Sequence, residues 1–427
     1  MTLRRLAFLI PLTLAACELG DEPTITDKTS PYYDRGCELE QHRRYKSDLV
    51  ADCRCFTNQA AVSGIDLCKR PYNLMKDGIS IGNGPSYAEA FNIEYNGGFV
   101  DDDEGPEGTV YVAASFGGST ARSGGVLAVD LATGDRSIVS GWDPTGVVDV
   151  VNSVLPEVGS GHPLESVNEV RRGPDGMLYA WVRTTPPAEQ EIVRIDPNDG
   201  ARTLVWKGRD DRFPQCEVIE DPSLGTLQTT DTGFAVDDAG NFYMGFSNPM
   251  QGRGILRISS DLSTCETLTG AGNTASGTRG TGPSMSGFVQ GFTIRGDKLY
   301  GFTTQPKQFL EVDLETGDRT LLWEPGGVTP PERHAAWDEA RGVWWIAGFQ
   351  NSVAIDAVDV ETGMNTSIFN GGVFDWMPLG AAGPVQINSL NYGPVWLRRN
   401  GNLLVAQDGM SIVEYEPKTG NSVIISL

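Results

Sequence analysis

The feature that most constrains this fold is a short phrase that recurs six times along the chain. Its copies are "AVDLATGDRSIVSG" (128–141), "RIDPNDGARTLVWKG" (194–208), "RISSDLSTCETLTG" (257–270), "EVDLETGDRTLLWEPG" (311–326), "AVDVETGMNTSIFNGG" (357–372) and "EYEPKTGNSVIISL" (414–427). In most copies two alternating apolar stretches flank an Asp or Asn, Thr and Gly turn, where Gly can adopt a positive φ. Each copy therefore predicts a β-hairpin.

A second type of hairpin precedes each copy. It is clearest in "EVRRGPDGMLYAWVRTT", "FAVDDAGNFYMGFSNP", "FTIRGDKLYGFTTQP" and "VWLRRNGNLLVAQDG", where an apolar strand enters a Gly-containing turn and continues into an apolar, often aromatic strand. Gly and Pro clusters such as "GTGPS" separate successive units. The chain therefore repeats a four-stranded antiparallel unit about every 58 residues.

This repetition predicts an all-β fold, namely a six-bladed β-propeller of four-stranded antiparallel blades over residues 82–427. A flat sandwich is the alternative, but six units in a row would leave long unpaired edges that ring closure removes. The strand "SVIISL" completes the last unit, so we expect closure to rest on packing between the first and last blades.

Tryptophans at recurring positions indicate how the blades pack. Trp206 and Trp323 occupy the same repeat position, so we expect both to pack between blades. Trp344 and Trp345 are adjacent in one predicted strand and therefore lie on opposite faces of it. On that basis one of these two is expected to be exposed.

The charge balance narrows the classes of partner. With 33 Lys and Arg against 56 Asp and Glu, the formal net charge is −23. Such an acidic chain repels nucleic acid and anionic lipid surfaces, so no nucleic-acid partner is expected. The 52 Gly and 25 Pro residues suit many short strands broken by turns.

The first residues predict where in the cell the protein is located. "MTLRRLAFLIPLTLAAC" has two arginines and then an apolar run too short to cross a membrane, so residues 1–16 are predicted to be a signal peptide. Leu14 to Cys17 resemble the lipobox of bacterial lipoproteins, which implies that Cys17 is lipidated, with palmitate among its acyl groups, and becomes the mature N-terminus. Glu18 rather than Asp follows, which implies a lipid anchor in the outer membrane, on its periplasmic side or at the cell surface.

Two segments separate this anchor from the propeller. Residues 17–36 are polar and are predicted to be a tether. Residues 37–81 form a small cysteine-rich segment, and an even number of cysteines in an exported protein predicts disulfides. The candidates are Cys37, Cys53, Cys55, Cys68, Cys216 and Cys265. The first four have three possible pairings, or a zinc site as an alternative, whereas Cys216 and Cys265 are expected to bond to each other.

A functional site is sought on the innermost strands, which face the central channel of a propeller. The candidate lining residues are Glu89, Glu165, Asn168, Asp231, Gln290, His334 and Asn391. Carboxylate and amide oxygens gathered on one axis suit a hard cation such as calcium. The alternative is an ordinary hydrated polar lining.

The hairpin phrases resemble those of six-bladed propellers of the NHL-repeat, gluconolactonase and streptogramin-lyase kind, whose blades carry similar "VDxxGNLY" and "IDxxTG" phrases. In gluconolactonases a cation held by Glu, Asn and Asp performs catalysis, but that motif does not match here residue by residue. The streptogramin-lyase resemblance would require a paired His and Glu near magnesium, and no aligned pair is evident. Of the three histidines, His162 is expected in a turn, and His334 is the better candidate for a role.

Two functions follow as hypotheses. The favoured one is a binding or scaffold module, anchored to the membrane through lipid, for a protein, peptide or glycan partner, because no nucleophile motif or phosphate-binding loop is present. The alternative is a metal-dependent hydrolase or lyase of the gluconolactonase type, with its site in the central channel.

Overall fold

A computed structural model describes the chain over part of its length. The described residues are 93–101, 108–116, 124–131, 136–142, 157–184, 190–208, 210, 212–213, 233–248, 252–272, 279–285, 289–304, 306–324, 335–348, 352–372, 375–378, 394–407, 411–415, 417 and 422–426. All regular secondary structure in these residues is β-strand, and none of it is a helix long and apolar enough to cross a membrane. The predicted signal peptide, tether and cysteine-rich segment lie outside the described residues.

Hydrogen bonding joins the strands into six antiparallel sheets, each in sequence order. The first contains β1 (Ile93–Asp101), β2 (Thr109–Phe116), β3 (Gly124–Asp130), β4 (Arg136–Trp142) and β5 (Glu157–Val158). The second contains β6 (Ser166–Arg172), β7 (Leu178–Arg183), β8 (Gln190–Ile195) and β9 (Arg202–Lys207). The third contains β10 (Phe234–Val236), β11 (Phe242–Asn248), β12 (Gly252–Ile258) and β13 (Cys265–Gly272).

The remaining three sheets follow the same plan. The fourth contains β14 (Val289–Arg295), β15 (Lys298–Thr304), β16 (Lys307–Asp313) and β17 (Arg319–Trp323). The fifth contains β18 (Ala335–Asp338), β19 (Val343–Gly348), β20 (Ser352–Asp359), β21 (Met364–Gly372) and β22 (Asp375–Pro378). The sixth contains β23 (Val395–Leu397), β24 (Leu403–Gln407), β25 (Ser411–Tyr415) and β26 (Ser422–Ser426). The four-stranded unit is thus confirmed, and the short strands β5 and β22 extend two of the sheets.

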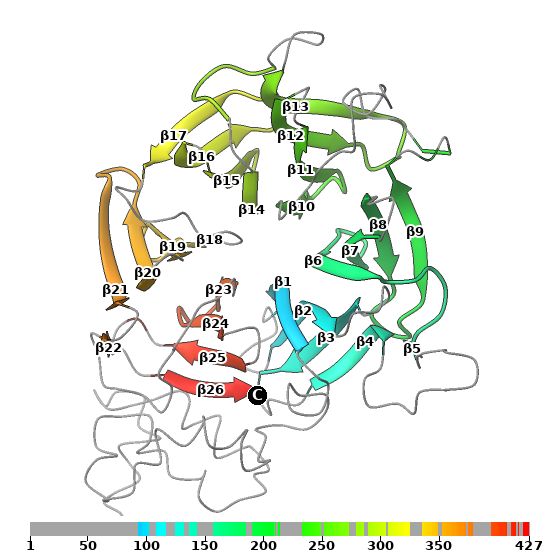
Figure 1. The fold of residues 1–427 in the computed structure, drawn as a ribbon, viewed down its shortest axis with the longest axis horizontal. Coiled ribbons are helices and arrows are strands. Elements are labelled where there is room, and N and C mark those ends of the chain that lie inside the picture. Colours follow the sequence, from blue (N-terminus) through cyan, green and yellow to red (C-terminus); the bar gives the residue numbers. More distant parts are fainter. Residues whose placement is uncertain are drawn as a thin grey trace, which may run out of the picture.

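The sheets stand around a common axis, with the first strand of each nearest the centre (Figure 1). Contacts between these first strands run from β1 to β6, β10, β14, β18 and β23, and β23 returns to β1. The fold is a β-propeller.

Apolar side chains fill the spaces between neighbouring sheets. Trp206 packs with Phe234 between the second and third sheets, and Trp323 packs beside Trp344 between the fourth and fifth. Both predictions of inter-blade packing are confirmed. The expected exposure of Trp344 or Trp345 was wrong: these side chains do lie in different clusters, but both are buried. A strand inside a propeller is covered on both faces, because each sheet has a neighbour on either side.

In the second and fourth sheets, the recurring Arg of the repeated phrase bonds to the connection that leads into its sheet. Arg202 donates from its backbone to Ser160 O at 2.7 Å and from Nε to His162 O. Arg319 repeats this with Thr281 O at 2.7 Å and Pro283 O at 2.8 Å. Both arginines are buried. The repetition therefore reflects an inter-sheet latch as well as a hairpin turn.

Candidate functional site

The two ends of the ring differ in the length of their connections. In an antiparallel sheet read in sequence order, the turns after the first and third strands share one end, which we call the turn end. The connections from one sheet to the next leave the fourth strand and enter the next first strand at the other end, which we call the loop end. Between these points, the described parts of two connections, 159–163 and 279–283, pass the turn-end residues Gly200 and Gly317. Turns such as 296–297 and 339–342 are short, whereas the longer segments 208–233 and 379–394 connect successive sheets. Long connections at one end of a rigid scaffold are the usual place for binding residues.

Aspartate side chains at the turn end are occupied by their own turns. Seven of them accept hydrogen bonds from backbone N–H groups nearby, namely Asp175, Asp196, Asp237, Asp261, Asp313, Asp338 and Asp359. Hydrogen bonds from Ser259 and Ser263 lower the pKa of Asp261 to about 2. These carboxylates therefore act as turn locks.

Three of the predicted channel residues are described: Glu165, Asn168 and Gln290. Glu165 and Asn168 are partly exposed at the start of β6, and Gln290 is buried on β14. The amide Oε1 of Gln290 is buried without a hydrogen-bond partner. Glu89, Asp231, His334 and Asn391 lie outside the described residues, so the predicted set is not tested as a whole. Within the described residues no group of three His, Cys, Asp or Glu side chains is placed to hold a metal ion.

The boundaries of the innermost strands differ from the prediction. The stretch containing Asp231 was predicted to be innermost, but β10 begins at Phe234. Likewise β23 begins at Val395, after the stretch that contains Asn391. Each unit begins with the hairpin that precedes the repeated phrase. The first strand of that hairpin is the innermost one, because it lies at the inner edge of each sheet.

The side chain at the centre of the ring is Arg171, which the sequence did not single out. Its guanidinium donates to three carbonyl oxygens from three other sheets: Gly98 O through Nη1, Phe234 O through Nε at 3.3 Å, and Phe292 O through Nη2 at 3.1 Å. Nη1 also lies 2.9 Å from Oε1 of Glu169. One cation thus connects β6 with β1, β10 and β14.

Glu169 and Gly97 complete this centre. The carboxylate of Glu169 is buried against the backbone of Gly97, where a Cβ atom would come within 2.2 Å of Oε2. A side chain at this position would therefore force the Glu169 carboxylate to move. Gly98 is equally constrained, because a Cβ there would lie 2.0 Å from Tyr111 O.

Irregular pairing in three of the first strands makes this arrangement possible. The register shifts between Tyr95 and Gly98 in β1, between Val167 and Glu169 in β6, and between Gln290 and Thr293 in β14. A bulge interrupts the ladder and re-aims nearby groups, so carbonyls at these points become available to Arg171. A sequence signal existed, since "EVRR" places three charged residues in one short strand.

Two further hydrogen bonds extend the links to all six first strands. Trp396 Nε1 on β23 donates to Gly98 O at 2.8 Å. Thr293 Oγ1 on β14 donates to Ala335 O on β18 at 2.9 Å. The expectation that closure rests on contacts between the first and last sheets agrees with the Trp396 contact.

His162 has a more specific environment than a turn residue needs. Its Nε2 lies 2.7 Å from Oε2 of Glu191, whose Oε1 accepts from Lys207 at 2.8 Å. Glu191 is buried, and burial opposes its ionisation, but hydrogen bonds from His162 and Lys207 outweigh this and lower the pKa of Glu191. The cluster holds the incoming connection against β8 and β9.

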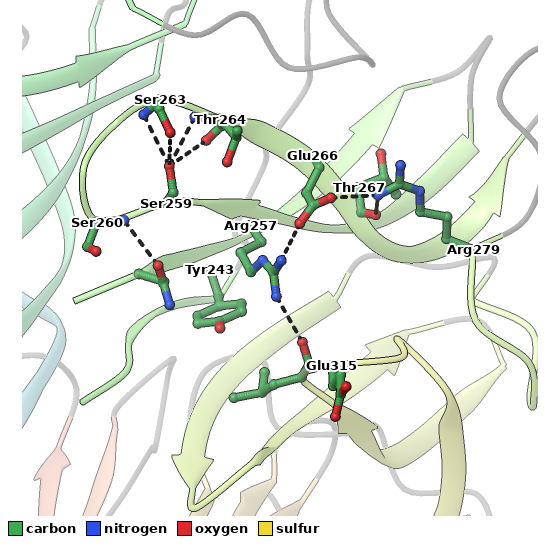
Figure 2. A network of polar contacts seen from close by, with 12 residues as sticks. Tyr243, Arg257, Ser259, Ser260, Ser263, Thr264, Glu266, Thr267, Arg279 and Glu315 are labelled. Atoms are coloured by element: carbon green, nitrogen blue, oxygen red, sulfur yellow. Dashed lines mark hydrogen bonds and ion pairs between the residues drawn. The ribbon is translucent and has the colours of Figure 1, made fainter. Parts of the chain in front are cut away.

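A comparable network joins the third and fourth sheets (Figure 2). Glu266 lies between Arg257 and Arg279, with nitrogen to oxygen distances of 2.5 Å and 2.9 Å. Arg257 also donates to Leu314 O of the next sheet at 3.2 Å. Burial opposes ionisation of Glu266, but the two arginines lower its pKa. All these donors and acceptors are used in holding sheets together.

Cys265 takes part in a disulfide bond. The other cysteines lie outside the described residues, so its pairing with Cys216 remains a prediction. Its position is informative, because Cys265 pairs with Ile258 where Arg202 pairs with Ile195 and Arg319 with Val312. In the third sheet a cysteine therefore stands where other sheets have the latch arginine.

Comparison with known proteins assigns this chain to no family. No family model matches the chain, and no curated protein matches it either. A streptogramin B lyase matches at 10% identity and TM-score 0.42, over 78% of this chain and 94% of that chain.

A periplasmic gluconolactonase of Pseudomonas aeruginosa matches at 13% identity and TM-score 0.42, over 77% and 84% of the two chains. A protein of unknown function from Bacteroides thetaiotaomicron matches at 12% identity and TM-score 0.44, over 78% and 74%. Identities this low say nothing of activity.

Proposed function

We propose that this protein is a lipid-anchored, six-bladed β-propeller of the cell envelope that acts as a binding or scaffold module for a protein, peptide or glycan partner. The observation that carries this proposal is the contrast between the two ends of the ring. Seven aspartates of the turn end bond to their own turns, as the bonds to Asp313 and Asp237 illustrate. The long connections leave and re-enter the sheets at strand ends of the loop end, where we expect a partner to bind.

Rigidity supports the same function. The latch arginines reach the preceding sheet, where Arg202 donates to Ser140 and Arg319 to Thr269, and Arg257 donates to Leu314 O of the next sheet. A scaffold whose sheets do not move relative to each other presents its loops with little loss of conformational entropy on binding. We place the anchor at Cys17, so replacing Cys17 with Ser should release the protein from membrane fractions.

Site-specific photocrosslinking in the envelope tests which end binds. Glu324 follows β17 at the loop end and is exposed, while Asn198 is exposed in the turn between β8 and β9 at the turn end. A photoreactive residue at Glu324 should give discrete crosslinked products that the same residue at Asn198 does not give. Equal crosslinking at the two positions, or none at Glu324, would contradict the proposal.

An activity assay on the purified protein tests the alternative, enzymatic function. A metal-dependent hydrolase or lyase should open lactones in the presence of calcium and lose that activity in Glu165→Gln, one of the channel candidates. Such activity, together with absence of loop-end crosslinks, would replace the binding function with the enzymatic one.

A further inference from the structure

The centre of the ring contains oxygen atoms from four strands. Gly98, Phe234 and Phe292 each contribute a backbone carbonyl, and Glu169 contributes a carboxylate. Convergent carbonyl and carboxylate oxygens are the ligand set of hard cations such as Ca²⁺. Here, however, the group among these oxygens is the guanidinium of Arg171.

We propose that Arg171 is the ring's built-in central cation: its guanidinium fills, from within the chain, an oxygen cage of the kind that binds a metal ion. This goes beyond the proposed binding function and does not depend on it. The expected calcium site does not fit at this level of the channel, because the position is already held by a positive group.

The charge balance of the cage supports this assignment. The side chain of Glu169 is 6% exposed and that of Arg171 is 15% exposed, so both charges are largely removed from water. A buried carboxylate requires a compensating cation, and a single guanidinium at 2.9 Å supplies it.

The shape of the group explains why the cation is an arginine. Guanidinium is planar and directs several N–H bonds in fixed directions, so one side chain reaches three carbonyls on three sheets. The ammonium of lysine is a single nitrogen and cannot span the same acceptors. The glycines on β1 allow the approach, since a Cβ at Gly97 would collide with the Glu169 carboxylate.

Truncation of the arginine tests the proposal directly. Arg171→Ala should lower the melting temperature by roughly 10 °C, because it leaves a buried carboxylate and several carbonyls without a donor. Arg183→Ala, which removes an exposed arginine of the same sheet, is the matched control and should melt like the wild type.

Adding cations to Arg171→Ala then tests whether the space left by the guanidinium binds a cation. Guanidinium chloride at non-denaturing, tens-of-millimolar concentration, or calcium chloride at millimolar concentration, should raise the melting temperature of Arg171→Ala. Sodium chloride of equal ionic strength should not, and neither should urea, the neutral isostere of guanidinium. Adding Glu169→Gln to Arg171→Ala should abolish the rescue, since the carboxylate that contacts Arg171 is then lost.

Rescue of Arg171→Ala that wild type and Arg183→Ala do not show supports the proposal. Wild-type stability of Arg171→Ala, or a loss that no cation restores, overturns it. If Arg171→Ala does not fold, Arg171→Lys decides: an intermediate melting temperature supports a multidentate guanidinium, and wild-type stability overturns it.

Discussion

Trp396 donates a hydrogen bond of 2.8 Å from its indole nitrogen to the carbonyl oxygen of Gly98, and so joins the last sheet to the first. The two residues are 298 positions apart in the chain. The same carbonyl accepts from Arg171. The Gly98 carbonyl therefore takes part both in binding the Arg171 guanidinium and in closing the ring.

Replacing Trp396 with Phe should weaken this closure. The variant keeps an aromatic ring but loses the donor, so the free energy of unfolding should fall by about 1 kcal/mol. Hydrogen exchange should also accelerate in β1. Trp323→Phe is a suitable control, because that side chain packs between the fourth and fifth sheets. Equal hydrogen-exchange rates in β1 of both variants would argue against a role for the Trp396 hydrogen bond in ring closure.

Alanine at Gly97 should be destabilising by about 2 kcal/mol through steric overlap with Glu169. A double-mutant cycle measures the cause. The cost of Gly97→Ala should largely disappear in an Glu169→Ala background, where the obstructing carboxylate is gone. Strictly additive effects in urea denaturation would show that the contact is not the reason.

The latch arginines should matter more than exposed ones. Arg319→Ala should cost about 3 kcal/mol, because Pro283 O and Arg279 O lose a charged donor in a buried place. Arg319→Lys should recover little of it. The control is Arg295→Ala, whose ion pair with Glu339 is long and exposed, and a similar loss in both would contradict the latch.

The third sheet should depend on a disulfide at the latch position. If Cys265 bonds to Cys216, in the connection that enters this sheet, then Cys216→Ser and Cys265→Ser should lose the same amount, about 3 kcal/mol. Peptide mapping without reduction should recover the two cysteines in one linked fragment. Recovery of Cys265 linked to Cys37, Cys53, Cys55 or Cys68 would disprove this pairing.

The Glu191 cluster should show in the acid limb of the stability profile. The folded pKa of Glu191 is lowered, so its contribution is complete above the unfolded value of about 4.3 and is lost as the pH falls through the folded pKa. Glu191→Gln should be about 2 kcal/mol less stable at pH 7, with a flatter decline below pH ~4. Urea denaturation at several pH values checks this, with the exposed Glu339→Gln as control.

The repeated phrases determined the architecture because strand periodicity and turn chemistry are local properties. "EVDLETGDRTLLW" carries its own alternation, its Asp313 turn lock and its positive-φ Gly317, and it forms β16, a tight turn and β17. The sequence also predicted the place of Trp206, since its position in the repeat sets the face on which it lies.

The tertiary structure alone decided what occupies the centre. Arg171 reaches carbonyls 63, 73 and 121 positions away, and no local pattern encodes such distances. The pairing shifts in β1, β6 and β14, and the polar residues named from the stretches aligned as innermost included Glu165, Asn168 and Gln290 but missed Glu169 and Arg171. Closure of the ring brings these strands together, and only then do Glu169 and Arg171 of β6 acquire the carbonyl partners on the other sheets.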